Sequence, residues 1–260
     1  MKLSIVTVCY NAEQSIERTI KSVLQQTKPV YEYIIIDGGS KDKTYSIVCS
    51  YDAAFKKKGI HYRHISEKDE GISDAFNKGI ERATGDLVGL INADDELLPD
   101  TNAILNEEYE KDEADIYYGN CIWVDVDRNI EYVSKPKHNL KKLLYFMVLI
   151  HPATFVKKTA YSDCGVFDKS YKLCMDKELL YRMYSAGKKF IYINQNLTKF
   201  KSGGVSDTHL RAVHEEGSRM ALQYGEPYIK VKMIEYYKLI RNGSVRVIKN
   251  TPLYRILKKI

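Results

Sequence analysis

The stretch GLINADDE, residues 89–96, sets an apolar run directly before three acidic side chains. Residues 87–91 have the continuous apolar character of a strand that is covered on both faces. Because neighbouring carboxylates repel one another, the adjacent Asp94 and Asp95 need a counter-charge, a hydrogen-bonding turn or solvent. The stretch therefore predicts a buried strand that ends in a polar site.

Two similar apolar runs and a more polar strand-like stretch precede this one, and helix-like segments separate them. The predicted strands cover 5–10, 33–36 and 60–65, and the predicted helices cover 13–26, 43–57 and 72–82. This alternation predicts an α/β fold with an open, mostly parallel, doubly wound sheet and helices on both faces. Ligands of such sheets bind beyond the carboxyl ends of the strands. Each predicted strand is followed by polar residues at that edge, which predicts a binding site there.

The chain after these elements predicts a second, less regular half. The expected elements are a helix over 99–112, a hairpin over 115–124 and 129–133, a helix over 140–146, strands over 153–156 and 190–193, and a helix over 176–186. Further helices follow, and the last, over 245–260, mixes apolar with basic residues. The expected division is a domain over 1–206, made of halves 1–98 and 99–206, and a basic helical extension over 207–260.

The positive charge of the chain is confined to its end. The 260 residues carry 40 Lys and Arg against 34 Asp and Glu, a formal net charge of +6. Residues 226–260 hold nine Lys or Arg and two Glu, a net charge of +7, so residues 1–225 carry −1. A local basic segment attracts acidic surfaces. Nucleic acid is not an expected partner, because no module of interleaved basic and aromatic residues is present.

Cysteine usage and apolar runs indicate where the protein works. The five cysteines form no C-x-x-C pair, which predicts reduced thiols. The longest apolar run, residues 143–150, is far below the roughly 20 residues that span a bilayer. The first residues predict a strand, not a signal peptide. The expected location is therefore the cytoplasm, with any membrane contact made at the surface.

The polar residues at the strand ends each admit two interpretations. The Asp94–Asp95 pair suits Mg²⁺ or Mn²⁺, because hard cations take oxygen ligands, but it suits equally a cap before the next helix. Asp37, followed by two glycines, suits a base or ribose contact, or only a turn. The fingerprints G-x-G-x-x-G and G-x-x-x-x-G-K-[ST] are absent, so any nucleotide binds by another scheme.

Three further residues, taken singly, favour structural roles. Lys78 lies one helical turn after Asp74 and suits a phosphate contact, but a lone lysine is more often solvated. His151 precedes a proline, and a lone histidine is more often structural than a ligand. Asp176 opens a predicted helix, where the helix dipole favours an acidic first turn.

Four blocks, in this order and spacing, resemble the family-2 glycosyltransferases, which have the GT-A fold. The blocks are residues 5–11, 37–44, 69–79 and 85–96. Three later stretches are similar to acceptor-side elements of the bacterial polysaccharide subgroup, which includes colanic-acid-type enzymes: HPATF at 151–155, DKELL at 176–180 and GGVS at 203–206. The resemblance covers residues 1–206 and implies a cytoplasmic enzyme, at times peripheral on the membrane, whose donor is a nucleotide-sugar, most often a UDP-sugar.

The resemblance also implies roles for individual residues. The nucleotide-sugar would be bound by Thr7, Tyr10, Asn11, Asp37, Asp69, Lys78, Asn92 and Asp94. Asp95 would bind Mn²⁺ or Mg²⁺. Asp176 matches the general base, which overrides its interpretation as a helix-start acid; the usual acidic pair reads Met175-Asp176 here, with Glu178 as a weaker substitute. An acceptor or diphosphate loop would contain His151, Gly204 and Ser206.

The implied chemistry needs two carboxylates in different environments. A sugar diphosphate leaves well only when its developing charge is neutralised, which a metal ion does directly. The hydroxyl of a glycan or polyprenyl-linked acceptor becomes nucleophilic when a carboxylate takes its proton. One base and in-line attack predict inversion at the anomeric carbon.

Other functions and the role of the tail stay open at this level. A nucleotidyltransferase should carry a Gly-rich basic loop after the first strand, and residues 10–13, YNAE, are not such a loop. A non-catalytic sugar-binding relative would not need Asp95 or Asp176. The basic segment 245–260 suits contact with an anionic membrane surface, or a packed helix with a solvated cationic face; membrane contact is slightly favoured.

Overall fold

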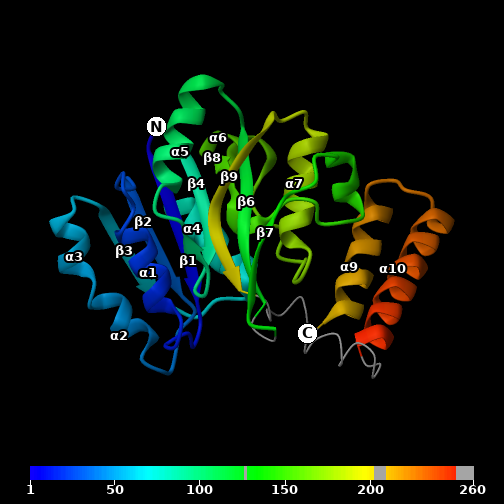
Figure 1. Cartoon of the computed structure of the whole chain (residues 1–260), viewed down its shortest axis with the longest axis horizontal. Helices are drawn as coiled ribbons and strands as arrows, with labels where there is room; N and C mark the ends of the chain where they lie inside the picture. The colour runs from blue at the N-terminus through cyan, green and yellow to red at the C-terminus, as the bar shows by residue number, and fades with distance from the viewer. Residues whose placement is uncertain (126–127, 202–208, 250–260) are drawn as a thin grey trace. The chain divides into compact units, whose positions relative to one another are not determined.

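The computed structural model describes residues 1–125, 128–201 and 209–249 (Figure 1). The chain separates into two compact units, Met1–Thr208 and His209–Ile260. The first unit holds the sheet, and the described part of the second, residues 209–249, holds two helices.

The amino-terminal half of the first unit is the predicted parallel sheet. Its strands, in the order β3-β2-β1-β4, are β1 (Leu3–Cys9), β2 (Glu32–Asp37), β3 (His61–Ser66) and β4 (Leu87–Asn92). One row of the register joins Ile65, Ile36, Val8 and Asn92 across all four strands. The carboxyl ends of the strands are therefore level, and the polar residues that follow them share one edge.

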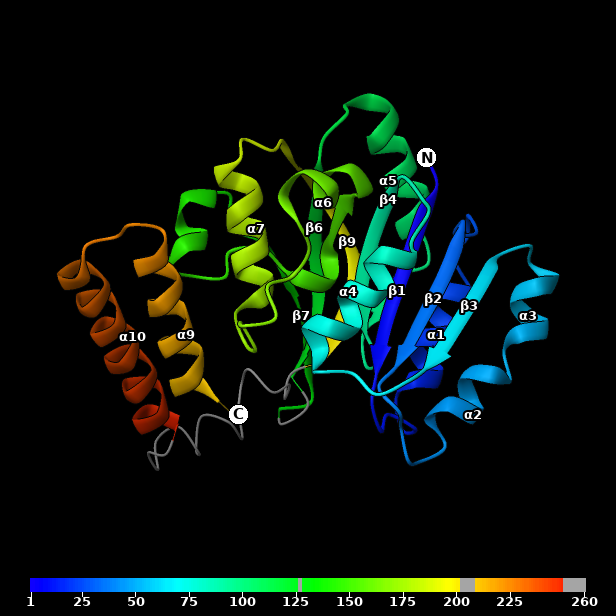
Figure 2. The same cartoon turned by 180° about the vertical axis from the view of Figure 1, so that it is seen from behind.

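Helices cover both faces of this parallel sheet, as predicted. They are α1 (Ile16–Leu24), α2 (Thr44–Cys49), α3 (Asp52–Lys57) and α4 (Ile72–Arg82). Figure 1 shows α1 in front of the strands, and Figure 2, the view from behind, shows α4. The packing of α4 on the sheet is close, because a Cβ on Gly79 would lie 2.2 Å from Val6 Cγ1. Only glycine permits this approach.

The single helix expected over 43–57 is two helices, α2 and α3. At the junction, the Ser50 hydroxyl donates to the carbonyl of Ile47 at 2.6 Å, and the Tyr51 hydroxyl donates to Glu17 of α1 at 2.8 Å. Side-chain bonds of the first kind compete with the helical ladder. The prediction of one continuous helix was wrong.

The second half of the first unit extends the sheet with antiparallel and parallel pairings. Its elements are β5 (Glu96–Leu97), α5 (Thr101–Lys111), β6 (Ile116–Asp125), β7 (Ile130–Ser134), the 3₁₀ helices η1 (Leu140–Leu144) and η2 (His151–Ala153), β8 (Thr154–Lys157), α6 (Lys158–Cys164), α7 (Met175–Ser185) and β9 (Phe190–Lys201). The full order is β3-β2-β1-β4-β8-β6-β9-β5, with β7 beside β6. Because β8 is antiparallel to β4 and to β6, the sheet is mixed.

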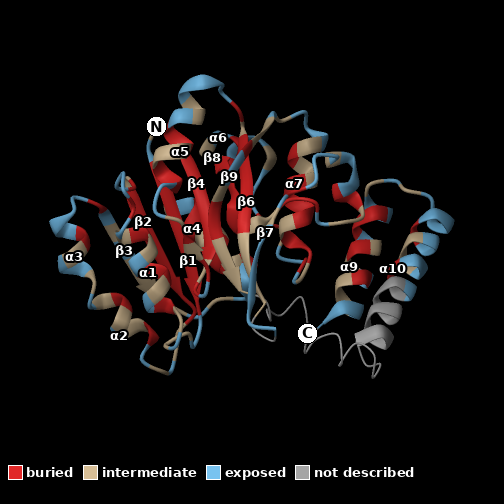
Figure 3. Cartoon of the chain, viewed as in Figure 1, coloured by how far each residue is buried: buried red, intermediate tan, exposed pale blue. Residues whose placement is uncertain are grey.

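Several elements of this half differ from the expectation. The helix predicted over 140–146 is the short 3₁₀ helix η1, and β9 runs for 12 residues where a strand over 190–193 was expected. Neither β5 nor α6 was predicted. The core runs through the central strands of the sheet, which Figure 3 shows as buried, whereas β3 and β7 are partly buried or exposed. Its fully buried side chains include Tyr33, Phe55, Tyr117 and Phe155.

The second unit is a helical hairpin of α9 (Leu210–Gln223) and α10 (Tyr228–Lys249). The helix predicted over 245–260 begins much earlier, at Tyr228, and residues 250–260 lie outside the described residues. Among the helices that the structure describes, none has the length and apolar character needed to cross a bilayer.

Candidate functional site

The turn after β2 holds a buried carboxylate, that of Asp37. Asp37 has no exposed surface, and its Oδ2 accepts hydrogen bonds from the Ser40 backbone N–H at 3.1 Å and from the Ser66 hydroxyl at 2.5 Å. Its Oδ1 accepts from the Ser40 hydroxyl and, at 3.7 Å, from the Cys9 thiol. Burial and the nearby Asp37 charge raise the pKa of the Cys9 thiol far above its usual range. The turn therefore presents backbone and hydroxyl groups around a fixed acid.

The turns after β1 and β2 are tied together beside this acid. The Asn11 backbone N–H donates to the Ser40 hydroxyl at 2.8 Å, and the Asn11 side-chain oxygen accepts from the Lys41 backbone N–H at 2.8 Å. Asn11 has a φ of 48°, a left-handed conformation that asparagine tolerates better than most residues. Tyr10, next to it, is 62% exposed. The Tyr10 ring is therefore exposed to solvent and could contact a ligand.

The Asp69 carboxylate and the Tyr10 ring both lie against Gly38. A Cβ built on Gly38 would be 2.5 Å from Asp69 Oδ2 and 3.5 Å from the Tyr10 ring. The Asp69 carboxylate is held by the Gly71 backbone N–H, which donates to Oδ1 at 2.9 Å. An aromatic ring, a bare stretch of backbone and a carboxylate suit a planar base with N–H donors, because the ring can stack and the carboxylate can accept.

We expect Gly38→Ala to weaken nucleotide binding without unfolding the protein. The new methyl group would displace Asp69, whose carboxylate is the end of a flexible side chain and can rotate away. Loss of one charge-assisted hydrogen bond of about 1.5 kcal/mol corresponds to roughly tenfold weaker binding. Calorimetric titration with UDP measures this effect, and the melting temperature should stay nearly unchanged. If the loss acts through Asp69, the double variant Gly38→Ala/Asp69→Ala should bind UDP as tightly as Asp69→Ala alone.

Two of the predicted donor-site residues lie in more protected settings. Thr7, in the middle of β1, has no exposed surface and accepts a hydrogen bond from the Tyr33 hydroxyl at 3.0 Å. The Lys78 ammonium lies 2.9 Å from Glu67 Oε1 and 3.4 Å from Asp74 Oδ2, and the hydrogen bond to Glu67 raises the pKa of Lys78. A phosphate would have to compete with these two carboxylates for Lys78.

The turn after β4 separates the acidic pair into a buried and an exposed member. Asp95 has no exposed surface, and its Oδ2 accepts from the backbone N–H and the side-chain amide of Asn92 at 3.1 and 3.0 Å. Its Oδ1 is buried without a hydrogen-bond partner among the described residues. Burial, and then the charge of the exposed Asp94, raise the pKa of Asp95 to about 8. An orphaned oxygen of this kind is a candidate ligand for a cation.

Asp176, at the start of α7, lies in a small cavity with His151. Leu90, two residues before Asn92, lines the same cavity. The His151 ring packs against the rings of Phe76 and Phe167 at 5.6 and 6.3 Å between centroids. Burial lowers the pKa of His151, although the Asp176 charge acts in the opposite sense. The structure thus brings together a carboxylate and a neutral imidazole that are 25 residues apart in the sequence.

The start of α4 is joined to the segment that leads into α7. The Ser73 hydroxyl donates to the carbonyl of Tyr171 at 3.1 Å and contacts Met175 Sδ at 2.7 Å. The Lys169 ammonium lies 2.7 Å from Glu70 Oε2 and 3.2 Å from Asp74 Oδ1. These contacts hold the loop that carries Asp69 beside the helix that carries Asp176.

Glu178 has a structural role. Its buried carboxylate pairs with Arg182 at 2.7 Å, and the Arg182 guanidinium also donates to the carbonyls of Cys164 and Val166 at 2.5 and 2.9 Å. Glu178 is therefore committed to fixing the turn after α6, and Asp176 is the acid at the start of α7 that stays available.

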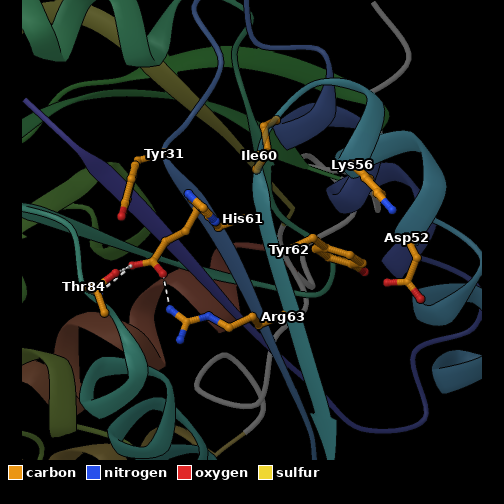
Figure 4. A pocket seen from close by; sticks show the side chains of 9 residues that line it. Tyr31, Asp52, Lys56, Ile60, His61, Tyr62, Arg63 and Thr84 are labelled. Atoms are coloured by element: carbon orange, nitrogen blue, oxygen red, sulfur yellow. Dashed lines mark hydrogen bonds and ion pairs between the residues drawn. The ribbon is translucent and has the colours of Figure 1, made fainter.

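A hollow of about 550 Å³ lies elsewhere, around the amino ends of β2 and β3 (Figure 4). Its buried acid, Glu32, is committed: it accepts hydrogen bonds from Ser4 at 2.6 Å and from the Thr84 backbone N–H at 2.5 Å, and it pairs with Arg63. In parallel sheets ligands bind at the carboxyl ends of the strands. We therefore assign the candidate site to the carboxyl edge of the sheet, although this hollow at the amino ends of the strands is large.

Sequence reasoning named most acids of this edge but missed the groups that hold them. Ser66, which donates to Asp37, carries no pattern that would mark it. Lys169 could have been suspected only from the charges around it. Gly204 and Ser206 lie outside the described residues. In the part of the chain that the structure describes, no group of three or more His, Cys, Asp or Glu side chains could hold a metal ion by itself.

Comparisons with known proteins identify the family of the chain. The family model described as Glycosyl transferase family 2 matches residues 4–171. A PGL/p-HBAD biosynthesis glycosyltransferase of Mycobacterium bovis is 27% identical over 184 residues, which are 70% of this chain and 69% of the relative. Chondroitin synthase of Escherichia coli is 27% identical over 237 residues, 85% of this chain but only 33% of that protein.

Solved structures confirm the fold. Staphylococcus aureus TarS 1–349, in complex with UDP-GlcNAc, has a TM-score of 0.68 at 18% identity and covers 94% of this chain and 73% of its own. The mannosyltransferase PcManGT from Pyrobaculum calidifontis, in complex with GDP-Man and Mn²⁺, has a TM-score of 0.65 at 15% identity, with coverage of 99% and 83%. The expected GT-A fold is confirmed by these neighbours.

Proposed function

The chain belongs to glycosyl transferase family 2 and is a glycosyltransferase, and from this premise we propose that it transfers a sugar from a UDP-sugar donor to the hydroxyl of a glycan or polyprenyl-linked acceptor. The transfer would invert the anomeric configuration and use a divalent cation. The observation that carries the proposal is the arrangement around β4. An unpartnered carboxylate oxygen of Asp95 follows the strand, and Asp176 shares a cavity with Leu90 of the same strand.

The donor would lie along the carboxyl edge of β1, β2 and β4. The uracil would stack near Tyr10 and hydrogen-bond with Asp69, over the bare backbone of Gly38. Asp37, Asn11 and Asn92 would shape the pocket around the nucleoside and ribose. The complex of the neighbour TarS with UDP-GlcNAc supports UDP as the nucleotide, and the biosynthetic role of chondroitin synthase supports a glycan product.

The residues at the end of β4 fit a divalent cation. Mg²⁺ and Mn²⁺ sites at nucleotides use one or two protein carboxylates and take the remaining ligands from the diphosphate, which agrees with the lack of a larger ligand cluster among the described residues. Asp95 would bind the ion through its unpartnered Oδ1, with the exposed Asp94 beside it facing the ribose or diphosphate. When bound, the ion neutralises charge on the leaving diphosphate. The neighbour PcManGT, which holds GDP-Man and Mn²⁺, supports this assignment.

Asp176 would act as the general base. As the acceptor oxygen forms its bond to the anomeric carbon, the bond from that carbon to the diphosphate oxygen breaks, and the acceptor proton passes to the Asp176 carboxylate. The nucleoside diphosphate leaves with the bonding electron pair. A single displacement of this kind inverts the anomeric configuration. His151, neutral in its buried setting, would limit the movement of Asp176 without competing for the proton.

Calorimetric titration of UDP, GDP, CDP and NAD, each with and without Mn²⁺, tests the donor and the cation together. We expect UDP to bind, more tightly with Mn²⁺, and the other nucleotides to bind at least about tenfold more weakly. Preference for GDP would replace the proposed donor and keep the cation. If none of the nucleotides binds under either condition, the proposal fails and the protein is a non-catalytic member of its family.

A further inference from the structure

Helix α10 has a packed face and, opposite to it, an exposed apolar face. The packed face contains the buried Val231 and Lys238, seven residues apart, and α9 contributes the buried His214, Met220 and Ala221. Residues seven apart lie two helical turns along the same face. The packing of this face against α9 holds the two helices together as a hairpin.

The second face is exposed and apolar. We call it the α10 stripe; its members are Ile229, Met233, Tyr236, Tyr237 and Ile240, each between 52 and 75% exposed. Their spacings of four, three, one and three residues place them on one side of a helix with 3.6 residues per turn. Single exposed apolar residues are ordinary, but a contiguous row of five on one helix indicates a surface that binds another protein or a membrane.

The chain that follows the α10 stripe is strongly basic. Residues 241–260 contain three Arg and three Lys and no Asp or Glu. An apolar helical face with tyrosines, continued by a segment of charge +6, has the composition of a helix that lies in the plane of an anionic membrane. A second copy of this chain would bring a like charge of +6 against it, which opposes self-association.

We propose that the α10 stripe is the membrane-binding face of this protein and that its partner is the surface of an anionic lipid bilayer. The stripe residues would enter the boundary between headgroups and acyl chains, and the basic segment would attract the lipid phosphates. This deepens the proposed function, on which it rests for its purpose: a polyprenyl-linked acceptor lies at such a surface. It also moves the expected contact from residues 245–260 to a face that begins at Ile229.

The test is flotation of the full-length protein with vesicles of phosphatidylcholine, with and without phosphatidylglycerol. We expect the protein to bind only the anionic vesicles and the double variant Ile229→Ser/Ile240→Ser to lose at least about tenfold in partition coefficient. The matched control is Leu210→Ser/Leu222→Ser, which removes two apolar side chains of α9 that are 47 and 40% exposed but lie off the stripe. This control should bind vesicles within about twofold of the unmodified protein.

Three results would overturn the proposal. They are failure of the unmodified protein to bind anionic vesicles, equal losses in the stripe and control variants, and a change of oligomeric state in the stripe variant with vesicle binding intact, which would show that a second copy covers the stripe. Titration of both variants with UDP and Mn²⁺ separates this outcome from the proposed transfer, because nucleotide binding should be the same in both.

Discussion

Asp176→Asn should lower glycosyl transfer by about 10²–10⁴-fold while UDP binding stays unchanged. The amide has nearly the shape of the carboxylate but cannot accept the acceptor proton. Asp176 lies at the start of α7, where its Oδ1 accepts a hydrogen bond from the Lys177 backbone N–H at 2.7 Å, an interaction that the asparagine oxygen can preserve. Product formation from a UDP-sugar measures the first effect, and calorimetry measures the second.

Glu178→Gln is the matched comparison on the same helical turn. It removes the charge that pairs with Arg182, so we expect the free energy of unfolding to fall by about 1–3 kcal/mol. The rate per folded molecule should remain close to that of the unmodified protein. Loss of transfer in Glu178→Gln with full activity in Asp176→Asn would show that Glu178, and not Asp176, is the general base.

Asp95→Asn should abolish the effect of Mn²⁺ on UDP binding and, with it, nearly all transfer. The change replaces the only oxygen at the end of β4 that is buried and lacks a partner among the described residues. Asp94→Asn should keep the Mn²⁺ effect and weaken UDP binding by roughly tenfold, the size expected for one contact to ribose or phosphate. The reverse pattern would make the exposed Asp94 the metal ligand.

The metal-free protein offers an independent measurement on Asp95. In the folded state its pKa is raised to about 8 from an ordinary value of 3.8, because of burial and the Asp94 charge. Between these values Asp95 is protonated in the folded state and ionised in the unfolded chain, so its contribution to stability falls as pH rises from about 4 to 8. Denaturant unfolding in the presence of a chelator should show this fall, and Asp95→Asn should remove it.

Strands β1, β2 and β4 could be predicted because burial on both faces leaves a continuous apolar run, whereas β3 is an edge strand that is only partly buried. β1 to β4 all lie where the sequence places them, and their polar ends meet at one edge. The short β5 and most of β9 could not be predicted, because their residues become strands by pairing with partners about 75 to 100 residues away. The division of 43–57 into two helices depends on a hydrogen bond between Tyr51 and α1, which is also a tertiary contact.

The candidate site, too, could be predicted from the sequence only in part. The sequence indicates which acids follow the strands, since they interrupt apolar runs. It does not indicate that Asp95 is buried and Asp94 exposed, because that depends on the path of the turn around Asn92. It also does not pair His151 with Asp176, since loops of different length bring them into one cavity. Residue type is local information, whereas burial and partners are set by the fold.

One strand sets the scale of the proposed reaction centre. Leu90 shares a cavity with Asp176, and Asp95 follows five residues later along the same chain segment. β4 is hydrogen-bonded on both sides, to β1 and β8, and the turn that follows it is closed by the hydrogen bonds from Asn92 to Asp95. The span between the cation end and the base end is therefore the same for every donor and acceptor. Evolution toward a larger sugar would have to act through the length of the surrounding loops.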